Sequence, residues 1–493
     1  MKRLPLVIWA MVLGAFAMGA DEFIVAGVVR EIAQGLNVSY GAVGALESVY
    51  ALGVAVGAPV FTAIGTRFGR RSMLLLTTGV FLVGNIVSAL GPNYETIMAG
   101  RVISATAHGA FLGIAAVFAA ELVDPVRKGR AVALVFTGLT VSTVLGAPMG
   151  AAVGQWLGWR FTFWTLVVFG GIALLGLLLS MKGREIPPGA VHNSEPALNH
   201  DDHGHTDPVH GNPAQGTEYE GLDAHALAHL GGGGHGPTMR EQVAALTRPA
   251  VWGALLTTML GYGGVFTSYV YIAPQLTEVT GFGDVWITPL LLLFGFGLFV
   301  GNALGGKLAD RAVMPTVLGT LTILALVLFV MTFALENQVT AAIGMFVFGV
   351  AAFAVVAPLQ LRVMNAAGHA PDVASAANIS AFTLGSAIGI ALGGQAIDGG
   401  LGLTSVNWVG GLITTAGVVV ALITWALLDR RTIASPGRDQ RTQDNHHEPH
   451  NQAVLDPKQH GGHSTVTAHQ EHPASADLSG HDASRRHHQP INS

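Results

Sequence analysis

The sequence contains no cysteine and little charge. Without cysteine the chain forms no disulfide, no thiolate metal site and no cysteine nucleophile. Only 11% of its 493 residues are charged, whereas 51% are hydrophobic and 65 are glycine. Soluble domains of ordinary composition carry about 25% charged residues. The composition therefore excludes an ordinary soluble protein and indicates a polytopic membrane protein.

Twelve apolar segments are long enough to cross a bilayer, because a spanning helix needs about 20 such residues. A polar stretch divides them six and six, so we expect an all-α membrane protein with two pseudo-symmetric six-helix bundles. The expected parts are a bundle at 1–181, a cytoplasmic loop at 182–248, a second bundle at 249–430 and a cytoplasmic tail at 431–493. The spans are predicted near residues 5–29, 40–64, 73–90, 96–120, 131–154, 160–181, 250–275, 285–306, 313–335, 339–361, 373–396 and 407–429.

The positions of lysine and arginine predict the orientation. With the N-terminus inside, 22 of the 25 basic residues lie in cytoplasmic segments, Arg30 and Arg160 lie outside, and Arg101 lies within a span. Cytoplasmic loops are enriched in basic residues, so we expect both termini inside the cytoplasmic membrane. A signal cleaved after Ala20 is the alternative interpretation of the first apolar run. It places Met18 at the −3 position and leaves an odd number of spans, which disfavours it.

The two halves contain an internal repeat. Residues 50–67 align without gaps on 294–311, which pairs Gly53 with Gly297 and Gly57 with Gly301. Duplicated halves are typical of transporters that build one site between two bundles. Glycines four residues apart also recur in spans two, five, eight and eleven, and such rows permit close helix contact. We therefore expect these four spans to slide at the interface between the halves.

Two loops resemble a family signature. The stretch "GTRFGRR" at 65–71 resembles the loop motif of the major facilitator superfamily, and "GKLADR" at 306–311 resembles its echo in the second half. The first copy has Thr66 where the family usually has an acid. The resemblance implies a cytoplasmic gate whose charges pair in one conformation and separate in another. The gate residues are Gly65, Arg67, Gly69, Arg70, Arg71, Gly306, Asp310 and Arg311.

Two further stretches resemble the branch of drug:proton antiporters. In "GLTVSTVLGAPMG" at 138–150, Gly138, Gly146, Pro148 and Gly150 match the antiporter motif. The stretch "RVISATAHGAFLG" at 101–113 resembles bacterial chloramphenicol exporters and sugar-efflux permeases. The resemblance implies a transporter and no enzyme, with proton-coupled efflux of small organic molecules, amphipathic drugs such as phenicols ahead of sugars.

Two adjacent acids, Asp21 and Glu22, lie inside the first span. A charge deep in the bilayer costs at least about 2.5–3.5 kcal/mol, so it usually faces a cavity or a partner. Counting along the helices places Glu22 near the depth of Arg101, with His108 on nearly the same face as Arg101 and Glu47 in reach. We expect these residues to couple protons, with Glu22 as the main carrier and Asp21 tuning it or meeting a polar part of the substrate. The structural alternative is a static arginine–glutamate pair.

The second half carries no matching charges. At the repeat offset, Phe266 and Met345 take the places of the acid and the arginine. We therefore expect proton chemistry in the first half. The second half is expected to offer substrate surfaces such as Tyr269, Tyr271 and Asn378.

The histidines raise a separate hypothesis. Of 20 histidines, eight lie in the central loop and ten in the tail, with His200, His203 and His205 close together. Clustered imidazoles suit Ni²⁺, Co²⁺, Cu²⁺ or Zn²⁺. Three functions stay open for these segments: a collector for a divalent-metal exporter, a metal or pH sensor, or a soluble tail. No other cofactor is expected, and the expected partners are a small-molecule substrate, protons and the lipid bilayer, with no nucleic acid.

Overall fold

The structure is a computed structural model that describes residues 6–65, 68–124, 127–181, 244, 246–368 and 371–429. These ranges contain twelve helices that are long and apolar enough to cross a membrane. Within them, every regular element is helical. The predicted all-α architecture with twelve spans is confirmed.

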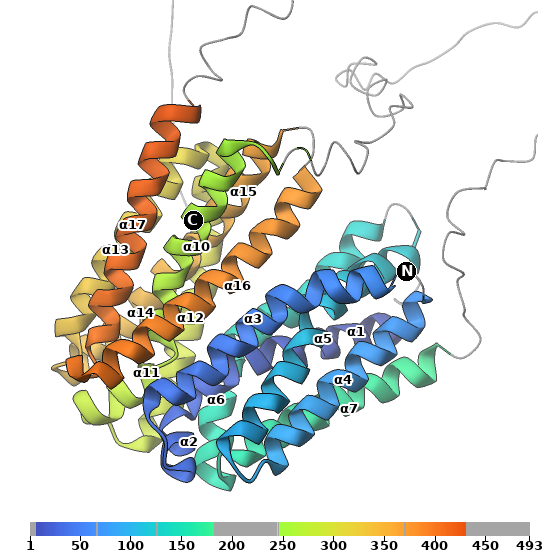
Figure 1. Ribbon diagram of the computed structural model, residues 1–493, viewed down its shortest axis with the longest axis horizontal. Coiled ribbons are helices and arrows are strands. Elements are labelled where there is room, and N and C mark those ends of the chain that lie inside the picture. The colour runs from blue at the N-terminus through green and yellow to red at the C-terminus, as the bar shows by residue number, and fades with distance from the viewer. Residues whose placement is uncertain are drawn as a thin grey trace, which may run out of the picture. The chain divides into compact units, whose positions relative to one another are not determined.

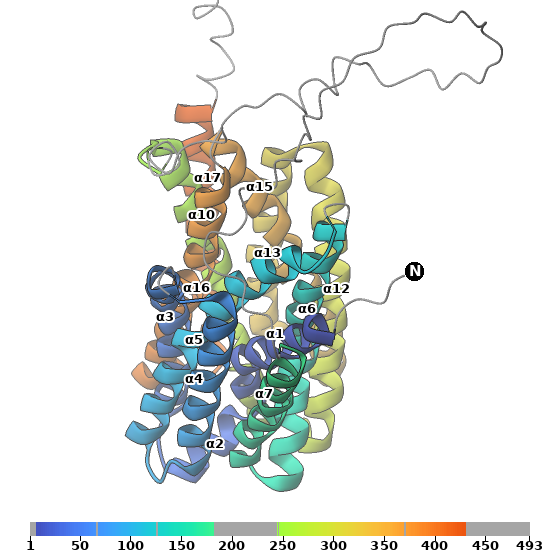
Figure 2. The same ribbon diagram turned by 90° about the vertical axis from the view of Figure 1, so that its right-hand side faces the viewer.

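In the first half, α1 contacts α3, α5, α6 and α7 (Figure 2). A short helix, α2, follows α1 and was not predicted. It buries Val29, Ile32 and Ala33 on one face, the spacing of an amphipathic helix, and ends at Asn37 in the left-handed conformation. The elements are α1 (Leu6–Ile24), η1 (Val25–Gly27), α2 (Val29–Leu36), α3 (Tyr40–Gly65), α4 (Arg70–Leu90), α5 (Tyr94–Glu121), α6 (Lys128–Leu157) and α7 (Arg160–Ser180).

The second six spans include two interrupted helices. Span seven breaks after Tyr269 and continues through a short turn, and span ten is divided at Val355. The elements are α10 (Pro249–Tyr269), α11 (Ile272–Pro274), η3 (Gln275–Val279), η4 (Asp284–Trp286), α12 (Ile287–Arg311), α13 (Val313–Ala334), α14 (Gln338–Ala354), α15 (Val356–Ala367), α16 (Pro371–Ala396), η5 (Ile397–Leu401), α17 (Ser405–Thr424) and η6 (Trp425–Asp429).

The internal repeat extends to helix packing. Gly57 of α3 faces the main chain of Thr106 in α5, and Gly301 of α12 faces the main chain of Val350 in α14. The two glycines are 244 positions apart, as are their two partners. A side chain at either glycine would overlap the facing backbone, so both close contacts depend on glycine.

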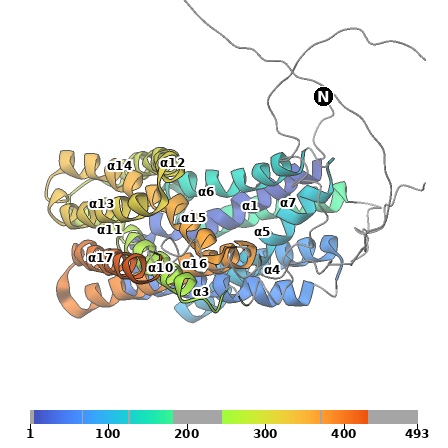
Figure 3. The same cartoon turned by 90° about the horizontal axis from the view of Figure 1, so that it is seen from above.

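The two halves meet through the four spans expected from the sequence. Helix α3 packs against α16, and α6 packs against α12 (Figure 3). The glycine rows of these helices do not form that interface, which corrects the expectation of a sliding glycine surface. They face segments of their own half: α5 for α3, α1 and the following Val28 for α6, α14 for α12, and α10 for α16.

Polar contacts between the halves gather at the end that carries α2 and α11, which we call the closed end (Figure 1). Among the described residues, every hydrogen bond or ion pair between the halves lies there. They join Arg30 to Asp284 at 2.6 Å, Ser39 to Asp398 at 2.8 Å, Gln155 to the carbonyl of Asp284 at 2.8 Å, Gly41 to Asp398 at 3.4 Å, and Tyr40 to Glu278. Toward the end of α7 and the start of α10 the ribbons of the halves separate (Figure 1).

Candidate functional site

Arg101 of α5 is held between two carboxylates in the interior of the first six helices. Its Nη1 donates to a carboxylate oxygen of Asp21 on α1 and, at 3.2 Å, to the main-chain carbonyl of the same residue. Its Nη2 donates to Glu47 Oε1 on α3 at 2.6 Å. The three side chains are at most 3% exposed. A single guanidinium therefore joins α1, α3 and α5.

Asn85 of α4 completes the surroundings of Asp21. Its Nδ2 donates to Asp21 Oδ2 at 3.2 Å, so the two oxygens of that carboxylate receive hydrogen bonds from different helices. Asn85 is 1% exposed, and its Oδ1 has no partner among the described residues. Asn85 was not among the residues predicted for the site. A lone asparagine in an apolar span was the available signal, because buried amides need partners.

Tyr50 of α3 connects Arg101 to His108 and was also missed. The Arg101 guanidinium carbon lies 4.0 Å from the centre of the Tyr50 ring, a cation–π contact. The Tyr50 hydroxyl lies 3.3 Å from the carbonyl of Met18 and 3.0 Å from His108 Nδ1. The Tyr50 hydroxyl has a single hydrogen. If it donates that hydrogen to the Met18 carbonyl, a hydrogen bond with His108 requires a proton on Nδ1 of the histidine. Tyr50 lies one turn beyond Glu47, on the same face of the helix.

The charges at Arg101 do not balance. Two carboxylates, Asp21 and Glu47, face one guanidinium in a region closed to solvent. Burying an uncompensated charge costs several kcal/mol. Adding one proton to either carboxylate neutralises the group. The arrangement can thus bind and release a proton when its surroundings change.

Glu22 is not the partner of Arg101. Successive helical residues point about 100° apart, and Asp21 takes the position beside the guanidinium that the sequence analysis gave to Glu22. Glu22 is half-buried, and no ion pair or hydrogen bond joins it to another of the described residues. The role of Glu22 as proton carrier stays a prediction.

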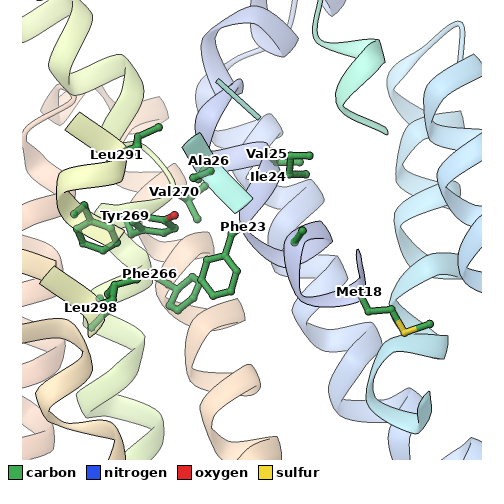
Figure 4. Close-up of a cluster of buried hydrophobic side chains, with 14 of the residues drawn as sticks. Met18, Phe23, Ile24, Val25, Ala26, Phe266, Tyr269, Val270, Leu291 and Leu298 are labelled. Carbon is green, nitrogen blue, oxygen red and sulfur yellow. The ribbon is translucent and has the colours of Figure 1, made fainter. Parts of the chain in front are cut away.

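The next residue, Phe23, reaches the second half of the molecule. Figure 4 shows its ring projecting from α1 toward Phe266 and Tyr269 of α10, with ring centres 6.0 Å apart in both cases. Tyr269 also stacks on Phe294 of α12 at 4.8 Å. The predicted substrate residue Tyr269 therefore lies in an aromatic cluster that spans the two halves.

The other two predicted substrate residues lie elsewhere. The Tyr271 hydroxyl donates to the carbonyl of Ile390 at 3.0 Å, which secures the break in span seven against α16. Asn378 donates to Gln360 Oε1 at 2.6 Å. Both contacts are internal to the second half, and the structure does not bring these residues together with Tyr269 at one site.

The gate motif lies at the end opposite the closed end. Arg70 forms an ion pair with Glu121, at the end of α5, which the sequence analysis did not single out. Arg67 lies outside the described residues. The remaining members are Gly65 at the end of α3, Gly69 before α4, Arg71 in its first turn, and Gly306, Asp310 and Arg311 in the last turns of α12. No ion pair joins Asp310 or Arg311 to another residue in the described ranges.

The antiporter motif packs α6 onto α1. Three motif glycines face α1 directly: Gly138 meets Val12, Gly146 meets Phe23 and Gly150 meets Ile24. Pro148 lies buried within the same helix. Helix α1, which carries both acids, therefore packs against α6, and α6 contacts the second half through α12.

The predicted metal ligands His200, His203 and His205 lie outside the described residues, as do residues 182–243 of the predicted loop and the whole predicted tail, 431–493. Within the described ranges, no group of three or more histidine, aspartate or glutamate residues is arranged to hold a metal ion.

Comparison with known proteins identifies the family. The profile of the Major Facilitator Superfamily matches residues 11–390. The inner membrane transport protein YdhP of Escherichia coli is 38% identical over 84% of this chain and 94% of that protein. The chloramphenicol resistance protein of Streptomyces lividans is 32% identical over 85% of this chain and 96% of that protein.

A solved structure confirms the fold. The crystal structure of a D-xylose-proton symporter aligns with a TM-score of 0.59 at 17% identity, covering 85% of this chain and 97% of that one. The twelve helices and the sequence matches agree. The chain belongs to the major facilitator superfamily and is a multi-pass membrane transporter, not an enzyme.

Proposed function

We propose that this transporter exports small amphipathic organic molecules across the cytoplasmic membrane in exchange for protons. The observation that carries the proposal is the contact of one buried guanidinium, Arg101, with two buried carboxylates, Asp21 and Glu47. The alternative is symport, in which the same solutes enter the cell together with protons. The experiment below distinguishes antiport from symport.

The excess carboxylate supplies the proton site. In the closed arrangement a bound proton removes the uncompensated negative charge near Arg101. A change that admits water or a substrate lowers the cost of that charge, and the proton leaves. The antiporter motif of α6 packs on α1 beside Asp21, so motion between the halves reaches the carboxylates through α6 and α1.

The contacts at the closed end support alternating access with the opposite side open. Under the positive-inside rule, the end of α7, the start of α10 and both termini face the cytoplasm, so the closed end faces outward. Arg30–Asp284 and Ser39–Asp398 then hold the outer side shut. Export requires these contacts to break after the substrate has entered from the cytoplasm.

The substrate class is supported by two observations. A relative that covers 85% of this chain is a chloramphenicol resistance protein, which favours phenicol-type drugs. The rings of Phe23, Phe266 and Tyr269 form an apolar aromatic cluster where the halves meet. Aromatic and apolar linings with few polar groups are typical of small-molecule sites.

The test uses everted membrane vesicles whose lumen has been acidified by respiration. Adding chloramphenicol to vesicles that contain the transporter should raise the luminal pH, because protons leave as the drug enters. Vesicles without the transporter should not respond. Drug accumulation that is unaffected when the proton gradient is collapsed contradicts antiport, and accumulation driven by the reverse gradient indicates symport.

A further inference from the structure

A chain of neutral polar side chains joins α15 and α16 in the second half. Asn378 Nδ2 of α16 donates to Gln360 Oε1 of α15 at 2.6 Å, and Gln360 Nε2 donates to Ser375 Oγ of α16 at 2.6 Å. Asn378 is fully buried, whereas Gln360 and Ser375 are half-buried. The chain therefore begins in the interior and ends at side chains that are partly exposed.

Two fully buried polar atoms in this region have no hydrogen-bond partner among the described residues. They are Asn378 Oδ1 and the hydroxyl oxygen of Thr258 on α10. Threonines in helices commonly donate to the carbonyl four residues earlier, as Thr257 and Thr267 of the same helix do at 2.8 and 2.9 Å. Buried polar atoms are normally hydrogen-bonded, so both atoms retain the capacity to bind a further group.

A ring contact places Thr258 and Asn378 in one region. The rings of Tyr262 on α10 and Phe382 on α16 meet edge-on, with their centres 4.7 Å apart. Thr258 comes four residues before Tyr262, one turn away on the same face of α10. Asn378 comes four residues before Phe382 in the same way. Helices α10 and α16 pack together and run in the same direction, so both polar residues lie on the side of the ring contact that is farther from the closed end (Figure 3).

A row of aromatic rings continues from this contact toward the closed end. Tyr262 packs on Phe266 at 5.4 Å, and Phe266 packs on Tyr269 at 5.9 Å between ring centres. Asn378 therefore lies at a separate position, at the opposite end of the row from Tyr269. Apolar linings with a few placed polar groups are typical of small-molecule sites. Neutral hydrogen-bonding groups beside aromatic rings match an uncharged aromatic molecule that carries hydroxyl or amide groups.

We propose that Thr258, Gln360 and Asn378 form an entry subsite that binds the hydroxyl or amide groups of uncharged aromatic molecules. This inference rests on the proposed export function and names the residues that recognise the polar part of its substrate. Asn378 Oδ1 accepts a hydrogen bond from the substrate, and Gln360 holds the Asn378 amide in position. The Thr258 hydroxyl donates to the substrate or accepts from it. A substrate that enters where the halves separate reaches this subsite before the rings near the closed end.

The test measures the binding of chloramphenicol, which has an aromatic ring, two hydroxyls and an amide but no charge. Equilibrium dialysis with the purified full-length protein compares the wild type with Thr258→Val and Asn378→Leu, which remove the polar atoms at similar side-chain size. Each substitution should weaken binding by about fivefold, the effect of losing one neutral hydrogen bond. Thr258→Val should keep or raise the melting temperature, because it removes a buried hydroxyl that has no described partner.

Control variants separate recognition from folding. Thr258→Ser keeps the hydroxyl and should retain most of the affinity. Thr332→Val in α13 also removes a buried hydroxyl without a described partner, and it should leave chloramphenicol binding unchanged.

The outcomes distinguish the subsite from the transport function. Wild-type affinity in either Thr258→Val or Asn378→Leu overturns the inference, even where the transporter exchanges the drug for protons. The proposed antiport fails separately, if chloramphenicol binds through these residues but moves no protons in vesicles. Absence of chloramphenicol binding to the wild type overturns both.

Discussion

Arg101 Nη2 lies 2.6 Å from Glu47 Oε1, and neither side chain is more than 3% exposed. Removing the guanidinium leaves Asp21 and Glu47 as two buried carboxylates without a counter-charge. Breaking a buried ion pair on one side costs about 3–5 kcal/mol. We expect Arg101→Ala to lower the thermal stability of the purified protein strongly, and Arg101→Lys to lower it less. Unchanged melting of Arg101→Ala contradicts this account of the site.

Tyr50 should affect the pH dependence of transport more than the fold. Tyr50→Phe keeps the ring beneath Arg101 but removes the hydroxyl between Met18 and His108. Loss of one such hydrogen bond costs about 1 kcal/mol of stability. We expect near-normal insertion and a shifted pH profile of drug-driven proton movement. A matched control is Tyr94→Phe, since among the described residues the Tyr94 hydroxyl bonds only to the carbonyl of Ala42. Identical pH profiles for the two variants contradict a role for the Tyr50 hydroxyl.

Asp398 should stabilise the closed end. It accepts hydrogen bonds from Ser39 Oγ and from the main chain of Gly41, at the start of α3. Two hydrogen bonds at about 1 kcal/mol each correspond to a shift of roughly tenfold or more in the balance between conformations. We expect Asp398→Ala to open this end more often.

The absence of cysteine makes that opening measurable. A Val43→Cys reporter, which is buried in α3 two residues after Gly41, should react faster with a maleimide when Asp398→Ala is also present. Asp284 is 55% exposed, and exposed pairs contribute only about 0–1 kcal/mol, so Asp284→Asn should accelerate labelling less. Equal labelling rates with and without Asp398→Ala contradict the assignment.

The repeated glycine contacts should be intolerant of side chains. A Cβ at Gly301 would overlap the main chain of Val350, so Gly301→Ala should lower stability by about 1–3 kcal/mol. Gly319 of α13 faces open space, and Gly319→Ala should be neutral or stabilising, since glycine weakens a helix by about 0.5–1 kcal/mol relative to alanine. Thermal melts of the two variants provide the check, and equal melting temperatures contradict it.

Much of the fold was predictable because bilayer-spanning helices are recognised in a sequence by their length and apolar composition. The twelve spans, the repeat between Gly57 and Gly301, and the four interface helices follow from such patterns. The sequence did not predict which neighbouring helix each glycine row contacts. Small residues permit close approach on either side of a helix, and only the tertiary structure selects the neighbour.

The sequence predicted the depth of the site residues in the membrane, but not which acid of α1 points toward Arg101. Counting along helices placed Arg101 level with the acids of α1, and burial without a partner made a contact necessary. Which of two adjacent acids faces Arg101 depends on the rotation of α1, which α6 and its glycines determine. Asn85 and Tyr50 escaped notice because a neutral polar residue in a span carries a weaker signal than a charge.

The central claim is that the carboxylates bound to Arg101 carry the exchanged proton. Its most direct test is drug-induced proton movement in everted vesicles with the double variant Asp21→Asn, Glu47→Gln, compared with drug–drug exchange in the same vesicles. The account predicts that proton movement is lost while exchange, which needs no net proton transfer, persists. If the double variant moves as many protons per drug molecule as the wild type, the account is contradicted.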